Sequence, residues 1–122
     1  MAIAVAITRD LIFSTKITGT GKALGLDARA ASLPSAARAA LSGGDTRLVF
    51  VDMALPESEG VDAIAHAAGL DPRPTIVAFY SHVDAKLAQM ATEAGADITL
   101  PRSRFTEELP AIFQKYCGAA AS

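Results

Sequence analysis

Five short apolar runs, separated by segments long enough to form helices, constrain the fold of this chain most strongly. The runs are Ile3–Ile7, Leu26–Ala30, Leu48–Val51, Thr75–Tyr80 and Asp97–Leu100. Three of them lack the alternation of polar and apolar residues that a half-solvated strand shows, so we expect strands that are buried on both faces. Strands of this kind form a parallel sheet with helices packed on both sides.

The segments between the runs carry signals for helix starts and ends. We expect helices over Asp10–Leu24, Pro34–Leu41, Gly60–Ala68, Asp84–Ala94 and Thr106–Tyr116. Asp10 can serve as the N-cap of the first helix, and Gly95 can end the fourth. With Thr106 as the N-cap of the last helix, Pro110 would fall in the first turn, where proline is tolerated. The last helix would then carry one apolar stripe, which consists of Phe105, Leu109, Ile112, Phe113 and Tyr116.

Length and composition favour one soluble domain. The chain has 122 residues, of which 51% are hydrophobic and 20% charged, and we expect a single stand-alone domain over 1–122 with a frayed tail at 118–122. The net charge of -2 gives no electrostatic reason to expect binding to nucleic acid or to a membrane. Cys117 is the only cysteine, which excludes an internal disulfide and favours a reducing, cytoplasmic location.

The sequence LVFVDMALPESEG, residues 48 to 60, places one acid at the end of an apolar run. Asp52 would lie at the carboxyl end of a parallel strand, the edge at which open sheets of this class bind ligands. Pro56 and Gly60 would shape the loop after it, and Gly60 is free to take a positive φ. Position alone leaves two interpretations open, since Asp52 could be a reactive carboxylate or could only accept hydrogen bonds from loop N–H groups.

This segment resembles the third-strand motif of receiver domains from two-component response regulators. In that family an apolar run ends in the aspartate that accepts a phosphoryl group, followed by a Pro and a Gly at the spacing of Pro56 and Gly60. TIVAFYSH (75–82) resembles the family's fourth strand, and AGADITLPRSRF (94–105) resembles its fifth strand and the loop after it. The resemblance covers most of the chain. It implies a flavodoxin-like (βα)5 sandwich, an α/β fold with a five-stranded parallel sheet and helices on both faces, and it makes Asp52 the phosphoacceptor candidate.

The resemblance also implies a metal site, at which this chain differs from the family. Two acids after the first strand hold Mg²⁺ in receiver domains, and these positions fall on Thr8 and Arg9, or with a shift of one residue on Arg9 and Asp10. At most Asp10 and Asp52 remain as metal ligands. Because Mg²⁺ is usually held by more than one carboxylate in near-octahedral geometry, we expect its binding to be weak or absent and expect no other cofactor.

Two further positions of the family's site also differ. The hydroxyl residue that ends the fourth strand, which acts as a switch in the family, falls on Tyr80, with Ser81 as the nearest small hydroxyl. The lysine that ends the fifth strand falls on Arg102. An arginine binds phosphate through two N–H groups, but it does not replace an ammonium in a slot that fits one.

We therefore expect an atypical receiver-like domain, or pseudo-receiver, in intracellular signal transduction. In this hypothesis Asp52 pairs with Arg102 or with Arg9, phosphorylation is disfavoured, and the chain acts by contact with another protein. A genuinely phosphorylatable single-domain response regulator and a small flavodoxin-like ligand-binding protein stay open as alternatives. No enzymatic activity is expected beyond self-phosphorylation on Asp52 from a donor.

The resemblance further implies a kind of partner and a surface that contacts it. The partner would be a signalling protein, either a histidine kinase or a downstream effector, and the chain itself would be a monomer or a weak dimer. The contact surface in the family corresponds here to Tyr80, Val83–Ala94, Thr99–Arg104 and Phe105–Tyr116.

Overall fold

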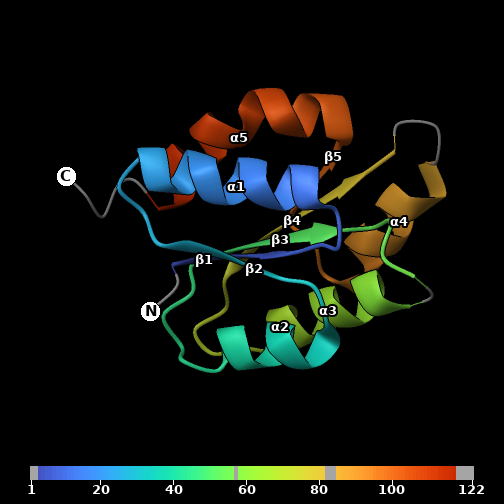
Figure 1. Ribbon diagram of the computed structural model, residues 1–122. Helices are drawn as coiled ribbons and strands as arrows, with labels where there is room; N and C mark the ends of the chain where they lie inside the picture. The colour runs from blue at the N-terminus through green and yellow to red at the C-terminus, as the bar shows by residue number, and fades with distance from the viewer. Residues whose placement is uncertain (1–2, 57, 82–84, 118–122) are drawn as a thin grey trace.

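A computed structural model describes residues 3–56, 58–81 and 85–117 as a single sheet covered by helices on both sides (Figure 1). The elements in chain order are β1 (Ala4–Ile7), α1 (Leu11–Ala23), β2 (Ala28–Ala31), α2 (Pro34–Leu41), β3 (Leu48–Asp52), α3 (Glu59–Ala68), β4 (Thr75–Tyr80), α4 (Ala85–Ala94), β5 (Ile98–Pro101) and α5 (Arg102–Tyr116). This strict alternation of strand and helix confirms the predicted (βα)5 architecture.

All neighbouring strands in the sheet are parallel, and their order is β2-β1-β3-β4-β5. The chain runs outward from β1 to β2 on one side and from β3 to β5 on the other. The strand order therefore switches between β1 and β3, where crevices form at the carboxyl edge of such sheets. Ile7 lies beside Val51 in this pair, and Asp52 follows Val51 as the last residue of β3.

Two apolar layers fill the space between the sheet and its helices. The layer under α1 and α5 contains Phe50, Phe79, Phe105 and Phe113, all fully buried. The opposite layer, under α2, α3 and α4, contains Val49, Val51, Ile64 and Ala91 among others. Because side chains alternate between the faces of a strand, Asp52 belongs to the same face as Phe50, beneath α1 and α5.

The start of α5 differs from the prediction. The helix begins at Arg102, with Pro101 as its N-cap residue, so the expectation that Thr106 is the N-cap is wrong. Pro110 consequently lies inside the helix rather than in its first turn. Proline is accommodated there because Pro110 faces solvent, where water can hydrate the carbonyl of Thr106 that loses its helical partner. The predicted apolar stripe is present, with Tyr116 partly buried and its other members buried.

Helix α1 forms although it contains two glycines. Gly21 faces β2 and α5, and a Cβ atom added there would lie 2.7 Å from the Cβ of Ala28 and 3.2 Å from the ring of Phe113. The close packing that this glycine permits offsets its low helix propensity of about 1 kcal/mol relative to alanine. Asp10 caps the helix as predicted, because its side chain accepts hydrogen bonds from the N–H groups of Ile12 and Phe13.

Some predictions fall outside the described residues. These are the frayed tail at 118–122, the first residue of the predicted fourth helix, Asp84, and Val83 of the predicted contact surface. Among the described residues, no helix combines the length and the apolar character that a membrane span needs.

Candidate functional site

The carboxylate of Asp52 is buried at the carboxyl edge of the sheet and accepts hydrogen bonds from three donors. The residue is 3% exposed. Its Oδ2 accepts a hydrogen bond from Thr8 Oγ1 at 2.7 Å, and its Oδ1 accepts one from the Ala54 backbone N–H at 2.9 Å. Nη2 of Arg102 lies 3.2 Å from both oxygens. Burial of a carboxylate costs free energy unless it is hydrogen-bonded and paired, and here Arg102 supplies the opposite charge.

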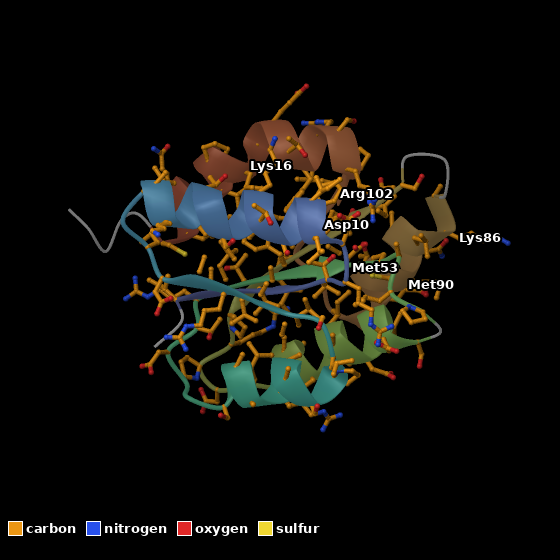
Figure 2. The ribbon with its side chains drawn as sticks, viewed as in Figure 1. Asp10, Lys16, Met53, Lys86, Met90 and Arg102 are labelled. Atoms are coloured by element: carbon orange, nitrogen blue, oxygen red, sulfur yellow. The ribbon has the colours of Figure 1, made fainter. Side chains whose placement is uncertain are left out.

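Arg102 bridges two acids. It is the first residue of α5, and while Nη2 contacts Asp52, Nη1 lies 3.5 Å from Oδ2 of Asp10. Its guanidinium carbon also lies 4.6 Å from the centroid of the Phe13 ring, a distance typical of a cation–π contact. Figure 2 shows Arg102 descending from α5 toward Asp10 at the start of α1. The guanidinium is thus held by two carboxylates and one aromatic face.

One atom of this arrangement lacks a partner. Nε of Arg102 is buried and has no hydrogen-bond acceptor among the described residues, although the side chain as a whole is 31% exposed. An unsatisfied buried N–H costs on the order of 1–3 kcal/mol. The contacts of Nη1 with Asp10 and of Nη2 with Asp52 offset that cost. The same two contacts hold the guanidinium in one orientation.

In the first of the two predicted alignments, the family's acid pair falls on Thr8 and Arg9. The side chains of these two residues contact different parts of the protein. Thr8 is buried, donates to Asp52 and accepts a hydrogen bond from the Asp10 backbone N–H at 3.0 Å. Arg9 instead donates from Nε to the Ser32 carbonyl at 3.1 Å and forms an ion pair with Glu59 at 3.0 Å. The structure therefore does not pair Arg9 with Asp52. Successive side chains at a strand end face opposite sides of the sheet, so Arg9 points away from the face that Thr8 and Asp52 share.

Asp10 has two roles at once. Its Oδ1 accepts the Ile12 and Phe13 N–H groups at 2.9 and 3.2 Å, as an N-cap does. Its Oδ2 faces Arg102. The Asp10 carboxylate thus contacts both the N-terminus of α1 and the Arg102 guanidinium. A further cation would have to compete with these two contacts.

The loop after Asp52 turns into α3 at Pro56, and Gly60 differs from its prediction. The Pro56 carbonyl accepts the Glu59 N–H at 3.1 Å, in the turn that leads into α3. Gly60 lies within α3, and among the described residues the glycines with positive φ are Gly25, Gly44 and Gly95, so the expected positive φ at Gly60 is wrong. Glycine is favoured there by close approach, because a Cβ would lie 3.3 Å from the Asp52 carbonyl oxygen.

Tyr80, which the sequence resemblance predicts to take the position of the switch hydroxyl, lies on the other face of the sheet from Asp52. Tyr80 is half-buried and packs against the apolar layer under α2, α3 and α4, whereas Asp52 faces α1 and α5. The residue paired with Asp52 in the sheet register is Phe79. Among the described residues no hydrogen bond joins Tyr80 to Asp52, and Ser81 is exposed to solvent.

The donor set at this edge does not fit Mg²⁺. The ion requires near-octahedral oxygen coordination and is usually bound through one or two free carboxylates. In the described part of the chain, no three His, Cys, Asp or Glu side chains come together as a metal-binding group. Of the acids at the edge, Asp10 and Asp52 both contact Arg102, so neither carboxylate is free of a cation.

Comparison with solved structures identifies the fold. The receiver domain of NtrX from Brucella abortus is 19% identical, with a TM-score of 0.80 over 93% of this chain and 96% of that one. A response regulator from Thermotoga maritima is 18% identical, with a TM-score of 0.78 over 97% of this chain and 99% of that one. NtrX from Brucella abortus in complex with ADP is 20% identical, with a TM-score of 0.79, and this chain covers only 27% of its length.

These likenesses confirm the fold that the sequence resemblance implied. No protein-family model matches the chain. No curated protein sequence matches it. At this level of identity the solved structures establish the fold alone.

Proposed function

We propose that this chain, which has the fold of a response-regulator receiver domain, is a pseudo-receiver that signals by contact with another protein. By the sequence resemblance Asp52 is the phosphoacceptor candidate, but in this proposal it serves as one half of a permanent ion pair. Arg102 takes over the charge compensation that a metal ion and a lysine would otherwise supply.

The observation that carries the proposal is the contact of Arg102 Nη2 with both Asp52 oxygens at 3.2 Å. A carboxylate that attacks phosphorus needs a free lone pair on one oxygen and a metal ion near the transferring oxygens. Here Thr8 and Arg102 occupy Oδ2, and Ala54 and Arg102 occupy Oδ1. Attack would require the ion pair to open first.

The same contacts support a proposal of weak Mg²⁺ binding. Asp10 is engaged by the N-terminus of α1 and by Arg102, and Thr8 offers a neutral hydroxyl where a carboxylate would be needed. We also propose that the chain has no enzymatic turnover of its own.

A phosphorylatable domain is the second candidate, and one feature favours it. Arg102 has two N–H groups directed at the edge of the sheet, and an arginine can hold phosphoryl oxygens with such a fork. If the ion pair opens easily, the same arginine could stabilise a phosphoryl group on Asp52.

The surface for a partner is proposed to be Tyr80 at the end of β4 together with α4, β5 and α5, at the side of the sheet away from β2. Met90 on α4 is 45% exposed and is the only large hydrophobic side chain of the described part of this surface that is this exposed. Arg104 and Glu108 pair on the outer face of α5 at 2.7 Å. An exposed apolar side chain with charges nearby suits a signalling protein partner such as a histidine kinase or a downstream effector.

Capture of cross-linked partners from the native cell tests this proposal. Wild type and Asp52→Asn should capture the same partner equally well without a phosphodonor, because the charge of Asp52 is already neutralised. Met90→Glu should lose the partner, whereas Leu24→Glu, a matched change at an exposed residue at the end of α1, should keep it. Capture that depends on a phosphodonor and is lost in Asp52→Asn would favour the second candidate.

A further inference from the structure

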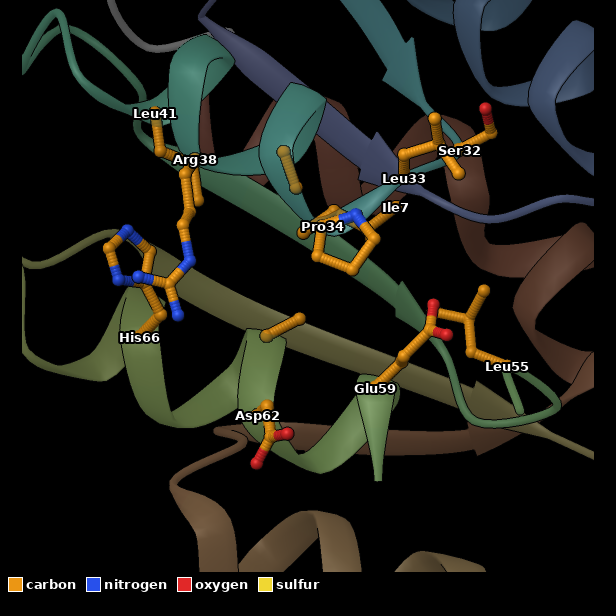
Figure 3. Close-up of a pocket in the computed structure, with 12 residues that line it drawn as sticks. Ile7, Ser32, Leu33, Pro34, Arg38, Leu41, Leu55, Glu59, Asp62 and His66 are labelled. Atoms are coloured by element: carbon orange, nitrogen blue, oxygen red, sulfur yellow. The ribbon is translucent and has the colours of Figure 1, made fainter. Parts of the chain in front are cut away.

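A pocket between α2 and α3 lies on the face of the sheet opposite the Asp52 carboxylate (Figure 3). It has a volume of about 100 Å³. Its floor is apolar and is formed by Ile7, Ala37, Leu41, Leu55 and Ala63. The floor therefore suits an apolar group of limited size, which the neighbouring helices would surround on two sides.

The rim of the pocket carries charges of both signs. In Figure 3 the Arg38 side chain runs from α2 toward His66 on α3, and Asp62 lies one helical turn before His66. The Arg38 guanidinium has no hydrogen-bond or ion-pair partner among the described residues. Glu59 also lines the pocket, but its charge is already paired with Arg9 at 3.0 Å. Among the described residues, the rim thus offers one cation without a partner, an imidazole beside it, and one acid.

We propose that this pocket binds a free α-amino acid with a short branched apolar side chain. The carboxylate of the ligand accepts hydrogen bonds from Arg38 and His66. Its ammonium group donates to Asp62, which keeps one oxygen available while the other accepts from Ser58 Oγ at 2.9 Å. The side chain of the ligand enters the apolar floor.

Dimensions support this class of ligand. Side chains four residues apart on a helix are separated by about 5–6 Å at their Cβ atoms, so His66 and Asp62 can flank the adjacent carboxylate and ammonium of one amino acid. An apolar cavity of about 150 Å³ holds benzene, so a pocket of about 100 Å³ has room for roughly four carbons. That is the number of carbons in the side chain of leucine.

The charges argue against other small ligands. A phosphate or a dicarboxylate would place excess negative charge near Asp62, which costs free energy at short range. An uncharged apolar molecule would gain nothing from the charges of Arg38 and Asp62, which are both exposed to solvent. A zwitterion matches the cation and the acid at the same time.

The site stands independently of the state of Asp52, although it borders the same loop. Leu55 of the pocket floor donates its N–H to the Asp52 carbonyl at 3.2 Å. Spectral changes on binding should therefore include the amide of Leu55.

Calorimetric titration of the full chain, together with amide NMR spectra, tests the proposal. The probes are L-leucine, 4-methylpentanoate, which lacks the ammonium, 3-methylbutylamine, which lacks the carboxylate, and glycine, which lacks the side chain. L-Leucine should bind at least roughly tenfold more tightly than each of the others, since each lacks one charged hydrogen bond or the apolar group. The amides of Leu55, Ala63 and His66 should shift.

Matched variants separate the site from nonspecific binding. Arg38→Gln should weaken L-leucine binding by roughly tenfold or more, and Asp62→Asn should make L-leucine and 4-methylpentanoate bind alike. Arg104→Gln, which removes the same charge from α5, should leave binding unchanged. No saturable binding of L-leucine, or equal binding by wild type and Arg38→Gln, would overturn the proposal.

Discussion

Arg102 and Asp52 are fifty residues apart in sequence, yet one guanidinium nitrogen of Arg102 lies 3.2 Å from both carboxylate oxygens of Asp52. The pair forms because β3 and β5 both end at the same edge of the sheet and α5 begins directly with Arg102. Asp52 is 3% exposed, so its charge depends on this contact more than a surface carboxylate would.

Replacement of Arg102 should therefore destabilise the protein. In Arg102→Gln the buried carboxylate keeps only the neutral donors Thr8 and Ala54, and we expect a loss of about 1–3 kcal/mol in the free energy of unfolding, since the pair is partly exposed on the arginine side. Urea denaturation at neutral pH measures this change in the free energy of unfolding. The control is Arg104→Gln, which breaks an exposed pair on α5 and should cost about 0.5 kcal/mol or less. Equal stability of the two variants would contradict the ion pair's role.

Asp52→Asn removes the charge and keeps the shape. Arg102 would retain the longer contact with Asp10 at 3.5 Å and the contact with the Phe13 ring, and we expect a loss on the order of 1 kcal/mol. Thermal and urea unfolding both report it. A higher melting temperature for Asp52→Asn would mean that the carboxylate is strained in the wild type, as in a site kept ready for a phosphoryl group.

We expect the dissociation constant of Mg²⁺ from the wild-type protein to lie above the millimolar range. Asp10 and Asp52 are both engaged by Arg102, and the ion would have to displace a charged side chain that is already in place. Calorimetry or amide NMR during a Mg²⁺ titration detects binding. The double variant Thr8→Asp/Arg9→Asp restores two acids after β1 and should bind the ion more tightly. Sub-millimolar affinity in the wild type would show that Arg102 moves aside readily.

Tyr80→Thr should alter partner binding more than stability. The Tyr80 ring packs against the apolar layer under α2, α3 and α4, and its removal should lower the free energy of unfolding by about 1 kcal/mol. A partner that binds the surface near α4 and β5 would also lose its contact with the ring. The partner captured from the native cell serves for the affinity measurement. Tyr80→Phe is the matched control and should behave as wild type. Unchanged affinity in Tyr80→Thr would remove Tyr80 from the contact surface.

The fold could be predicted from the sequence because its strands are short, apolar and separated by clear helix signals. Leu48–Val51 has no polar residue, which is the pattern of a strand buried on both faces. The start of α5 was harder to predict. Pro110 suggested a helix start four residues before it, and only the three-dimensional structure shows that Pro110 faces solvent, where its cost is lowest.

The central pair of the candidate site could be predicted from the sequence, but the residues that contact this pair could not all be predicted. The resemblance identified Asp52 and Arg102, and their charges suggested the pairing. The donor role of Thr8 was missed, although strand alternation offered a signal, since Thr8 follows Ile7 onto the face that Asp52 occupies. The contact of Phe13 with Arg102 could not be foreseen, because it depends on how α1 and α5 pack on the sheet.

Intact-mass measurement after incubation with acetyl phosphate and Mg²⁺ tests the central claim most directly. The wild type should gain no phosphoryl group, because Arg102 and Thr8 occupy the Asp52 oxygens. The variant Thr8→Asp/Arg9→Asp/Arg102→Lys, which restores the acid pair and the lysine, is the positive control and should gain one phosphoryl group that is lost when Asp52→Asn is added. If the wild type itself gains one phosphoryl group, and Asp52→Asn abolishes the gain, the ion pair is not permanent and the pseudo-receiver account is contradicted.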